Sequence, residues 1–162
     1  MDDFGVPALQ RLLQRFPAAL QSTHADHGDA TAVVDRESLP AVMALLRDDP
    51  TLHFEMLTDL CAVDSLPRTP RFEVVYHLYS VARNQRLRIK VLVSEDAPAV
   101  PSLVPLFQSA NWMEREVFDL YGIRFEGHPD LRRILLYDEF EGHPLRKDYP
   151  KERRQPLVGP QN

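Results

Sequence analysis

The sequence predicts an α/β (α+β) fold, a compact domain in which helices flank a mainly antiparallel sheet, followed by an extended C-terminal arm. Apolar residues recur at helical spacing near the N-terminus, and two consecutive runs in the middle of the chain alternate apolar with polar residues as strands do. Beyond residue 137 no period is sustained, and recurring prolines prevent a long helix. We therefore assign residues 1–137 to the domain and residues 138–162 to the arm.

The first predicted elements are a helix, a short strand and a second helix. Residues 6–16, "VPALQRLLQRF", place apolar side chains at helical spacing, with Pro7 in the first turn. The polar stretch "STHADHGDA" then breaks this pattern and predicts a loop. "TAVV" at residues 31–34 is typical of a strand, and Ser38 is positioned as the N-cap of a helix over residues 39–48.

The next region contains an ambiguous segment and a hairpin. Residues 52–67 fit a helix about as well as a strand and a turn, so both alternatives stay open. Residues 72–78 and 87–93 alternate apolar and polar side chains, which predicts two antiparallel strands with one buried face. Three cations of the second strand would lie on the opposite face, where they are solvated or meet an acidic partner. They are Arg86, Arg88 and Lys90.

The last predicted helix follows a proline-rich turn. A turn and a short helix with Ser102 as its cap are predicted within "APAVPSLVPLF". Asn111 and Glu114 then have the spacing of a capping box, which predicts a helix of about three turns that starts at Trp112. Gly122 is placed to end this helix in a left-handed conformation.

The charged residues of this helix do not predict a catalytic or metal-binding pair. Glu114 and Glu116 lie about 200° apart around a helix, so they cannot converge on one substrate bond or one metal ion. Arg115 and Asp119 are four residues apart, which predicts a local ion pair. No predicted helix carries a histidine in a metal-binding register, and the H-x-x-H pair of the N-terminal loop lacks further ligands, so we predict no metal site.

Composition argues against several classes of function. The net charge of −5 speaks against a broad nucleic-acid-binding face. The single cysteine, Cys61, excludes an internal disulfide or a multi-cysteine cluster, and its apolar surroundings indicate a buried thiol. The acidic start "MDDFGVP" predicts no export signal, and the longest apolar run, residues 41–46, is too short to span a bilayer. Membrane contact is therefore expected only through a partner.

Two motifs resemble a known protein family. Residues 114–135, "EREVFDLYGIRFEGHPDLRRIL", and residues 142–150, "GHPLRKDYP", are similar to the signatures of the 30-kilodalton subunit, or C subunit, of the proton-translocating NADH:quinone oxidoreductase, respiratory complex I. The resemblance extends over residues 52–150. Phe140 departs from it, because many members carry Trp there, and we expect this change to alter local packing only.

The resemblance implies a non-catalytic subunit of the peripheral arm of the complex, on the cytoplasmic side of the bacterial inner membrane. It implies no cofactor in this chain, because NADH, FMN, iron–sulfur clusters and quinone are bound by other subunits. The D, B and I subunits of the complex are the expected contacts. Two alternatives stay open: the equivalent subunit of a membrane-bound hydrogenase or other non-NADH complex, and a stand-alone hydrolase using Glu116, Asp119 and His128.

The same stretch and the arm supply the predicted partner interface, because aromatic and guanidinium side chains dominate protein interfaces. We expect residues 138–150 to be mobile in the isolated chain and ordered in the complex, and the cations of the arm to serve assembly instead of the fold. Beyond the helix over residues 6–16 and the loop after it, the conformation of residues 1–30 is not predicted, and neither is that of residues 150–162. The predicted interface residues are Trp112, Glu114, Arg115, Glu116, Asp119, His128, Arg132, Arg133, His143, Arg146, Lys147, Asp148 and Tyr149.

Overall fold

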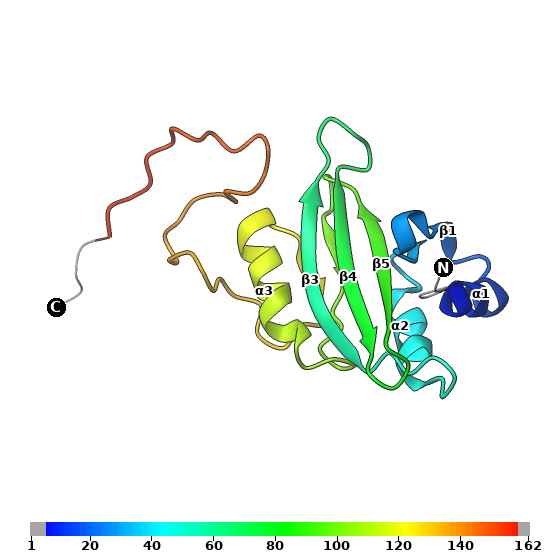
Figure 1. The fold of residues 1–162 in the computed structure, drawn as a ribbon. Helices are drawn as coiled ribbons and strands as arrows, with labels where there is room; N and C mark the ends of the chain where they lie inside the picture. Colours follow the sequence, from blue (N-terminus) through cyan, green and yellow to red (C-terminus); the bar gives the residue numbers. More distant parts are fainter. Residues whose placement is uncertain (1–5, 159–162) are drawn as a thin grey trace.

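The computed structural model describes residues 6–158 and shows an α/β domain built on a five-stranded sheet (Figure 1). The acidic start of the chain and the last four residues of the predicted arm lie outside the described residues. The elements in chain order are α1 (Val6–Arg15), β1 (Leu20–His24), the 3-10 helix η1 (Asp26–Gly28), β2 (Thr31–Val34), α2 (Leu39–Asp48), β3 (Met56–Asp64), β4 (Phe72–Ser80), β5 (Gln85–Val93), β6 (Ala99–Pro101), α3 (Ala110–Tyr121) and β7 (Arg124–Glu126).

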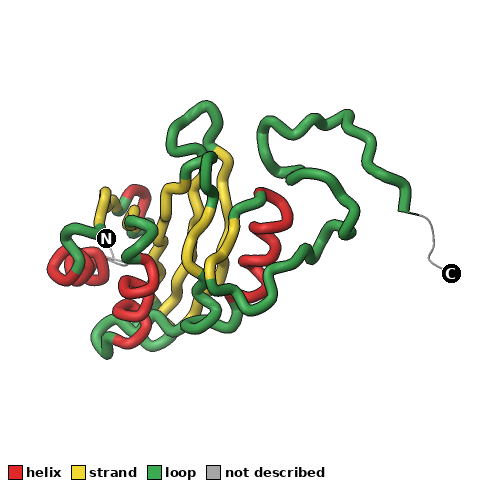
Figure 2. The backbone as a smooth tube through the Cα atoms, turned by 180° about the vertical axis from the view of Figure 1, so that it is seen from behind, coloured by secondary structure: helices red, strands yellow, loops and turns green. Residues whose placement is uncertain are grey.

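The sheet has the strand order β1-β2-β5-β4-β3, and every neighbouring pair except β2–β5 is antiparallel. This confirms the predicted mainly antiparallel sheet and the hairpin of β4 and β5. The register is irregular at two points, between Leu20 and Ser22 and between Leu57 and Asp59. Strands β6 and β7 form a separate parallel pair. Beyond β7 the described chain contains no helix or strand (Figure 2).

One face of the sheet is buried and the other is open. Alternate residues of β4 and β5, such as Tyr76 and Ile89, join the core with Met43 of α2 and Val117 of α3. Figures 1 and 2 show α1 and α2 at the β1–β2 side and α3 beside β3. No helix within residues 6–158 is both long and apolar enough to cross a membrane.

Two strands lack clean alternation of buried and exposed residues: the first was predicted as part of a loop, and the second was left open between a helix and a strand with a turn. β1 replaces a predicted loop; it is a mostly exposed strand, so hydrophobic periodicity gave no signal for it. The ambiguous segment forms β3, whose shift in register disturbs the alternation of buried residues. On the open face, Arg88 pairs with Asp29 at 3.1 Å and Lys90 with Glu73 at 3.0 Å, so these two cations have acidic partners within the chain.

The two predicted helix caps have different outcomes. Ser38 lies at the N-cap position of α2 as predicted, but its side chain makes no capping hydrogen bond; Asp35 Oδ1 accepts a hydrogen bond from the Ser38 amide at 3.2 Å. No helix follows Ser102, where the chain forms only turns. The Ser102 hydroxyl contacts α3 instead, and this contact belongs to the site described next.

Candidate functional site

Helix α3 is unusual because three charged residues, Glu114, Arg115 and Asp119, are buried along it. Charged side chains are rarely buried unless they are paired. The helix begins earlier than predicted, with Ser109 at the N-cap and without any side-chain cap. The predicted capping box is therefore wrong, and Glu114 has a different role.

Glu114 is fully buried and connects α3 to the segment after β6. Its two carboxyl oxygens contact the Ser102 hydroxyl and the Leu103 amide, each at 2.7 Å. Burial disfavours the charged form and raises the pKa of Glu114 to about 7, although both hydrogen bonds oppose this shift. Glu114 therefore changes between its neutral and its charged form close to neutral pH, although it is buried in the core.

We expect replacement of Glu114 by Gln to remove a pH dependence of stability. The folded chain holds a proton on Glu114 up to about pH 7, whereas an unfolded chain releases it near 4.5. The free energy of unfolding of the native protein should therefore fall by about 3 kcal/mol as the pH rises through this range. Gln mimics the neutral acid, so E114Q should lack that fall in urea titrations at several pH values.

Glu116→Gln is the matched control, because Glu116 is exposed on the same helix. The difference between the two variants isolates the buried carboxyl from other groups that titrate in this range. If the free energy of unfolding depends on pH equally in E114Q and E116Q, Glu114 is charged in the folded protein.

Asp119 holds the segment that follows β7 against α3. The side chain is fully buried, and its Oδ2 accepts hydrogen bonds from the amides of residues 134–136 at 3.0, 2.8 and 2.9 Å. Oδ1 accepts one from Arg133 Nη1 at 2.7 Å. Burial alone would raise the pKa of Asp119, but these donors outweigh it and lower the pKa. The predicted Arg115–Asp119 pair is wrong, because Arg133 is the partner of Asp119.

Arg115 instead donates to backbone carbonyls. Its Nε contacts the carbonyl of Arg132 at 3.2 Å, and its Nη2 contacts that of Arg133 at 3.1 Å. The guanidinium lies 5.2 Å from the ring centroid of Trp112, which is 63% exposed. Arg115 and Asp119 thus fix the same loop from two points and leave the indole at the surface.

The arm satisfies the carbonyl groups that the end of α3 leaves unpaired. His143 Nδ1 contacts the carbonyl of Asp119 at 2.9 Å, and Arg146 Nε donates to that of Tyr121 at 2.6 Å. The amide of Leu145 donates to the carbonyl of residue 120 at 3.1 Å. Burial lowers the pKa of His143. The cation of Arg146 also suits the negative end of the helix dipole.

Gly122 makes this contact sterically feasible. As predicted, it ends α3 in a left-handed conformation, with φ of 74°. A Cβ atom added there would lie 2.5 Å from His143 Nε2. The absence of a side chain therefore serves both the backbone conformation and the close approach of the arm.

A second cluster attaches the arm to the start of β4. Arg71 is 3% exposed, and its guanidinium bonds three carboxylates. It contacts both oxygens of Asp64 at 3.0 and 2.7 Å, both oxygens of Asp148 at 3.0 and 2.6 Å, and Glu95 at 2.5 Å. The Lys147 amide also donates to Asp64 at 2.8 Å. Hydrogen bonds from Arg71 are the largest cause that holds the pKa of Asp64 and Asp148 low.

Aromatic rings hold the outer part of the arm together. Phe140 lies edge-on to Tyr137 at 5.6 Å and stacks on Tyr149 at 6.2 Å. Arg133 lies 5.9 Å from the Phe140 ring. The Glu141 amide donates to the side chain of Gln155 at 3.0 Å, so the tail, residues 150–158, contacts the arm. The effect on local packing of Phe140 in place of Trp stays a prediction.

The arm, which we expect to be mobile in the isolated chain, makes several contacts with the domain. His143, Arg146 and Asp148 contact the domain, and Arg146 also lies 5.2 Å from the Phe72 ring. Arg146, one of the arm cations expected to serve assembly, is thus in contact with the domain, and its contribution to stability stays a prediction. The side chain of Lys147 donates to the carbonyl of Leu66 from an exposed position. The boundary between domain and arm at residue 137 stays a prediction.

The remaining predicted interface residues lie nearer the surface. His128 accepts a hydrogen bond from the Asp130 amide at 3.0 Å through Nδ1 and contacts the Asn111 carbonyl at 3.1 Å through Nε2. Arg132 is exposed and pairs with Asp130 at 2.9 Å, and Glu116 is exposed. The partner role of all thirteen residues stays a prediction.

The candidate hydrolase residues do not form an open site. Asp119 is fully buried and its oxygens are occupied by the donors described above, so it has no surface for a substrate. Cys61 differs from the expected buried thiol, because it is only partly buried. Burial is the largest cause that raises the pKa of its thiol, which therefore lacks the thiolate character of a catalytic nucleophile.

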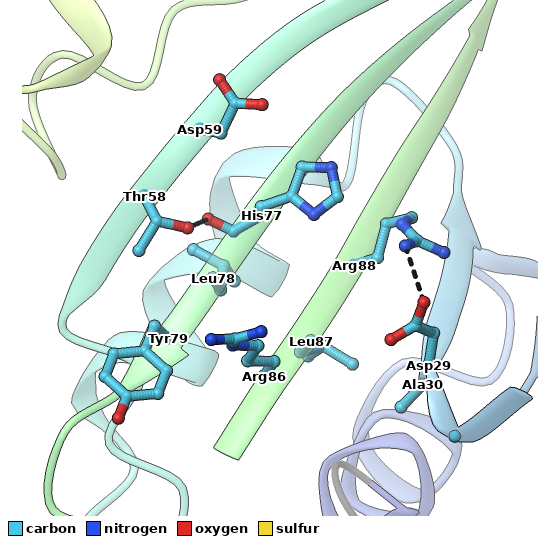
Figure 3. Close-up of a pocket in the computed structure, with 11 residues that line it drawn as sticks. Asp29, Ala30, Thr58, Asp59, His77, Leu78, Tyr79, Arg86, Leu87 and Arg88 are labelled. Carbon is cyan, nitrogen blue, oxygen red and sulfur yellow. Dashed lines mark hydrogen bonds and ion pairs between the residues drawn. The ribbon is translucent and has the colours of Figure 1, made fainter. Parts of the chain in front are cut away.

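A separate hollow of about 510 Å³ lies on the open face of the sheet (Figure 3). Asp59 of β3 and His77 of β4 line it, together with Arg88 of β5, whose guanidinium points toward Asp29. Spacing along the sequence gave no reason to group these residues, because they come from different strands. Asp59 also lines a smaller hollow with Glu116 of α3 and Leu145 of the arm, so the two surfaces meet at β3.

Comparisons with known proteins cover most of the chain. A family model described as "Respiratory-chain NADH dehydrogenase, 30 Kd subunit" matches residues 32–155. The NADH-quinone oxidoreductase C subunit of Acidithiobacillus ferrooxidans is 50% identical over 147 residues, which cover 87% of this chain and 73% of that protein. The C subunit of Roseiflexus castenholzii is 51% identical over 142 residues, which cover 88% of this chain and 82% of that protein.

Two solved structures share the fold. A trypsin-resistant fragment (1-134) of Nqo5 has 36% identity and a TM-score of 0.66, and the match covers 76% of this chain and 99% of that chain. A chain of a membrane-bound sulfane sulfur reductase, described as an archaeal respiratory membrane complex, has a TM-score of 0.76 at 22% identity, over 91% of this chain and 86% of that chain. At that identity the second match shows the fold alone.

Proposed function

Because this chain belongs to the family of the 30 Kd subunit of respiratory-chain NADH dehydrogenase, we propose that it acts as the C subunit in the peripheral arm of an NADH–quinone oxidoreductase. The observation that carries this proposal is the 50% identity over 147 residues to a relative of that name. The matched region includes both α3 and most of the arm. NADH as the electron donor follows from the names of these relatives, and it is favoured over a hydrogenase-type complex for that reason.

The role that we propose for this chain is to hold neighbouring subunits together without a catalytic centre of its own. The D, B and I subunits are the proposed partners, and NADH, FMN, iron–sulfur clusters and quinone are assigned to other subunits. The complex would face the cytoplasm, with this chain attached peripherally. Two buried charges of α3 support this role, because Arg115 and Asp119 are occupied in holding the loop in place. The arm is held by the backbone carbonyls at the end of the same helix.

The proposed contact surface combines two exposed parts. Trp112 and Leu135 are 63% and 61% exposed, although both are large and apolar. Beyond Tyr149 the described chain extends away from the domain (Figure 1). The inner part of the arm is fixed to the domain, whereas the hydrogen bonds of residues 150–158 run to exposed positions of the arm such as Glu141, so this outer segment is the one that we propose to lie on a partner. The Nqo5 relative is a trypsin-resistant fragment, which supports a compact body that is separable from other parts of such subunits.

We expect a chain that ends at Tyr149 to fold normally but to assemble poorly. It retains the contacts of His143, Arg146 and Asp148 with the domain, so its melting temperature should stay close to that of the full chain. Loss of the tail should lower co-purification with the D subunit and the NADH–quinone reductase activity of membranes. Cells that lack the gene and are complemented with either version provide the measurement.

The complementation experiment tests the proposed function and the role of the tail separately. Membranes that keep full NADH–quinone reductase activity without this chain would reject the proposed function. Full restoration by the chain ending at Tyr149 would reject only the role of the tail. Complementation with the full chain is the control in both cases.

A further inference from the structure

Three metal-ligating side chains meet on the open face of the sheet, at the side where β3 borders α3. A carboxylate oxygen of Asp59, the sulfur of Cys61 and a ring nitrogen of His77 all lie within 4.8 Å of one another. Asp59 and Cys61 are two residues apart on β3, and His77 of β4 is the register partner of Asp59. Two paired strands thus hold the three donors, which we call the Asp59–Cys61–His77 cluster.

We propose that the Asp59–Cys61–His77 cluster binds a divalent transition-metal ion, with zinc as the best chemical fit. Thiolate, imidazole and carboxylate are the donors that zinc uses in proteins. In a tetrahedral zinc site, neighbouring donor atoms are roughly 3.4–3.6 Å apart, as bond lengths of about 2.0–2.3 Å require. The cluster reaches that spacing by side-chain rotation, chiefly of the exposed Asp59.

The charges around the cluster permit a cation. Arg88 and Lys90 are the nearby positive groups on β5, and both are held by acids of their own, Asp29 and Glu73. Figure 3 shows the Arg88 guanidinium directed toward Asp29. On binding, the thiol of Cys61 releases its proton to solvent and the sulfur bonds the metal. The thiolate and the carboxylate of Asp59 then balance the two positive charges of the ion.

The surroundings also leave room for a fourth ligand. Asp59 and His77 line the hollow of about 510 Å³ on this face. Three protein ligands with an open fourth position are the arrangement of zinc sites that accept water or an exogenous ligand. A smaller hollow of about 140 Å³ is lined by Asp59 and Cys61 and by Glu116 of α3, so a further carboxylate lies near the cluster.

Cobalt titration of the purified, reduced full chain tests this proposal, because Cys61 is the single cysteine. A thiolate-to-cobalt charge-transfer band can arise only at its sulfur. We expect this band to saturate at one equivalent of Co²⁺ and to disappear when Zn²⁺ displaces it. H77N and D59N should each weaken binding by at least about 10-fold.

Matched controls use the exposed pair formed by His24, at the end of β1, and Asp26 of η1. H24N and D26N should leave the band and the affinity unchanged. The absence of a band in the native chain would overturn the proposal. A band that both H77N and D59N leave unchanged would also overturn it, because it would indicate adventitious binding by the thiol alone. Circular dichroism checks that each variant is folded, and the test is independent of assembly into the respiratory complex.

Discussion

Replacing Asp119 by Ala is expected to lower the free energy of unfolding by about 3–5 kcal/mol, because it breaks a buried ion pair from one side. The change leaves the Arg133 guanidinium without its carboxylate. It also leaves three consecutive amides, those of residues 134–136, without their acceptor. Urea unfolding at neutral pH measures the loss.

Two further variants sharpen this prediction. Asp119→Asn keeps an acceptor oxygen but not the charge, so its free energy of unfolding should lie between those of the native protein and D119A. Asp130→Ala is the control, because Asp130 pairs with the exposed Arg132 in the same loop, and exposed pairs contribute little. Trypsin should also cleave after Arg132 and Arg133 faster in D119A. A loss in D119A no larger than in D130A would contradict the role assigned to Asp119.

Replacing Arg71 by Ala is expected to be comparably destabilising, by about 3–5 kcal/mol at neutral pH. It removes the guanidinium that bonds Asp64, Glu95 and Asp148, and it leaves Asp64 charged and buried. Arg71→Lys should recover only part of the loss, since an ammonium cannot form the paired hydrogen bonds of a guanidinium. Chemical unfolding and the rate of trypsin cleavage after Lys147 report the two consequences, lost stability and a released arm.

The stability lost in R71A should become smaller as the pH falls. The pKa values of Asp64 and Asp148 are lowered in the folded chain, so their contribution is present at neutral pH and is lost as the pH falls below their ordinary value of 3.8. The native protein and R71A should therefore become more alike in acid. Arg88→Ala, which breaks an exposed pair, is the matched control. A difference between native protein and R71A that grows in acid would contradict this assignment.

Patterns formed by neighbouring residues in the sequence were enough to predict several of the helices and strands. Alternation placed β4 and β5, helical spacing placed α1 and α2, and Gly122 marked the end of α3. The family resemblance is confirmed over a longer region than expected, residues 32–155. These features depend on residues that are neighbours along the chain, and a single sequence records them directly.

The partners of the buried charges could not be predicted in the same way. The spacing rule for helices assigned Asp119 to Arg115, but the tertiary contact with Arg133, from a loop 14 residues away in sequence, is the one that forms. Arg71 stands in no motif, and its partner Asp148 is 77 residues away. Glu114 had the spacing of a capping residue, yet it is buried against Ser102. Such pairings depend on the folded arrangement of distant segments.

The two shifts in strand register have a consequence for how this protein can associate. The outermost strands, β1 and β3, carry them, and such bulges twist a sheet edge away from regular pairing. An unprotected edge is a template for strand addition and aggregation. Helix α3 beside β3 blocks that side further (Figure 1). We therefore expect other chains to be recognised through side chains and the projecting tail, and not through extension of the sheet by a neighbour's backbone.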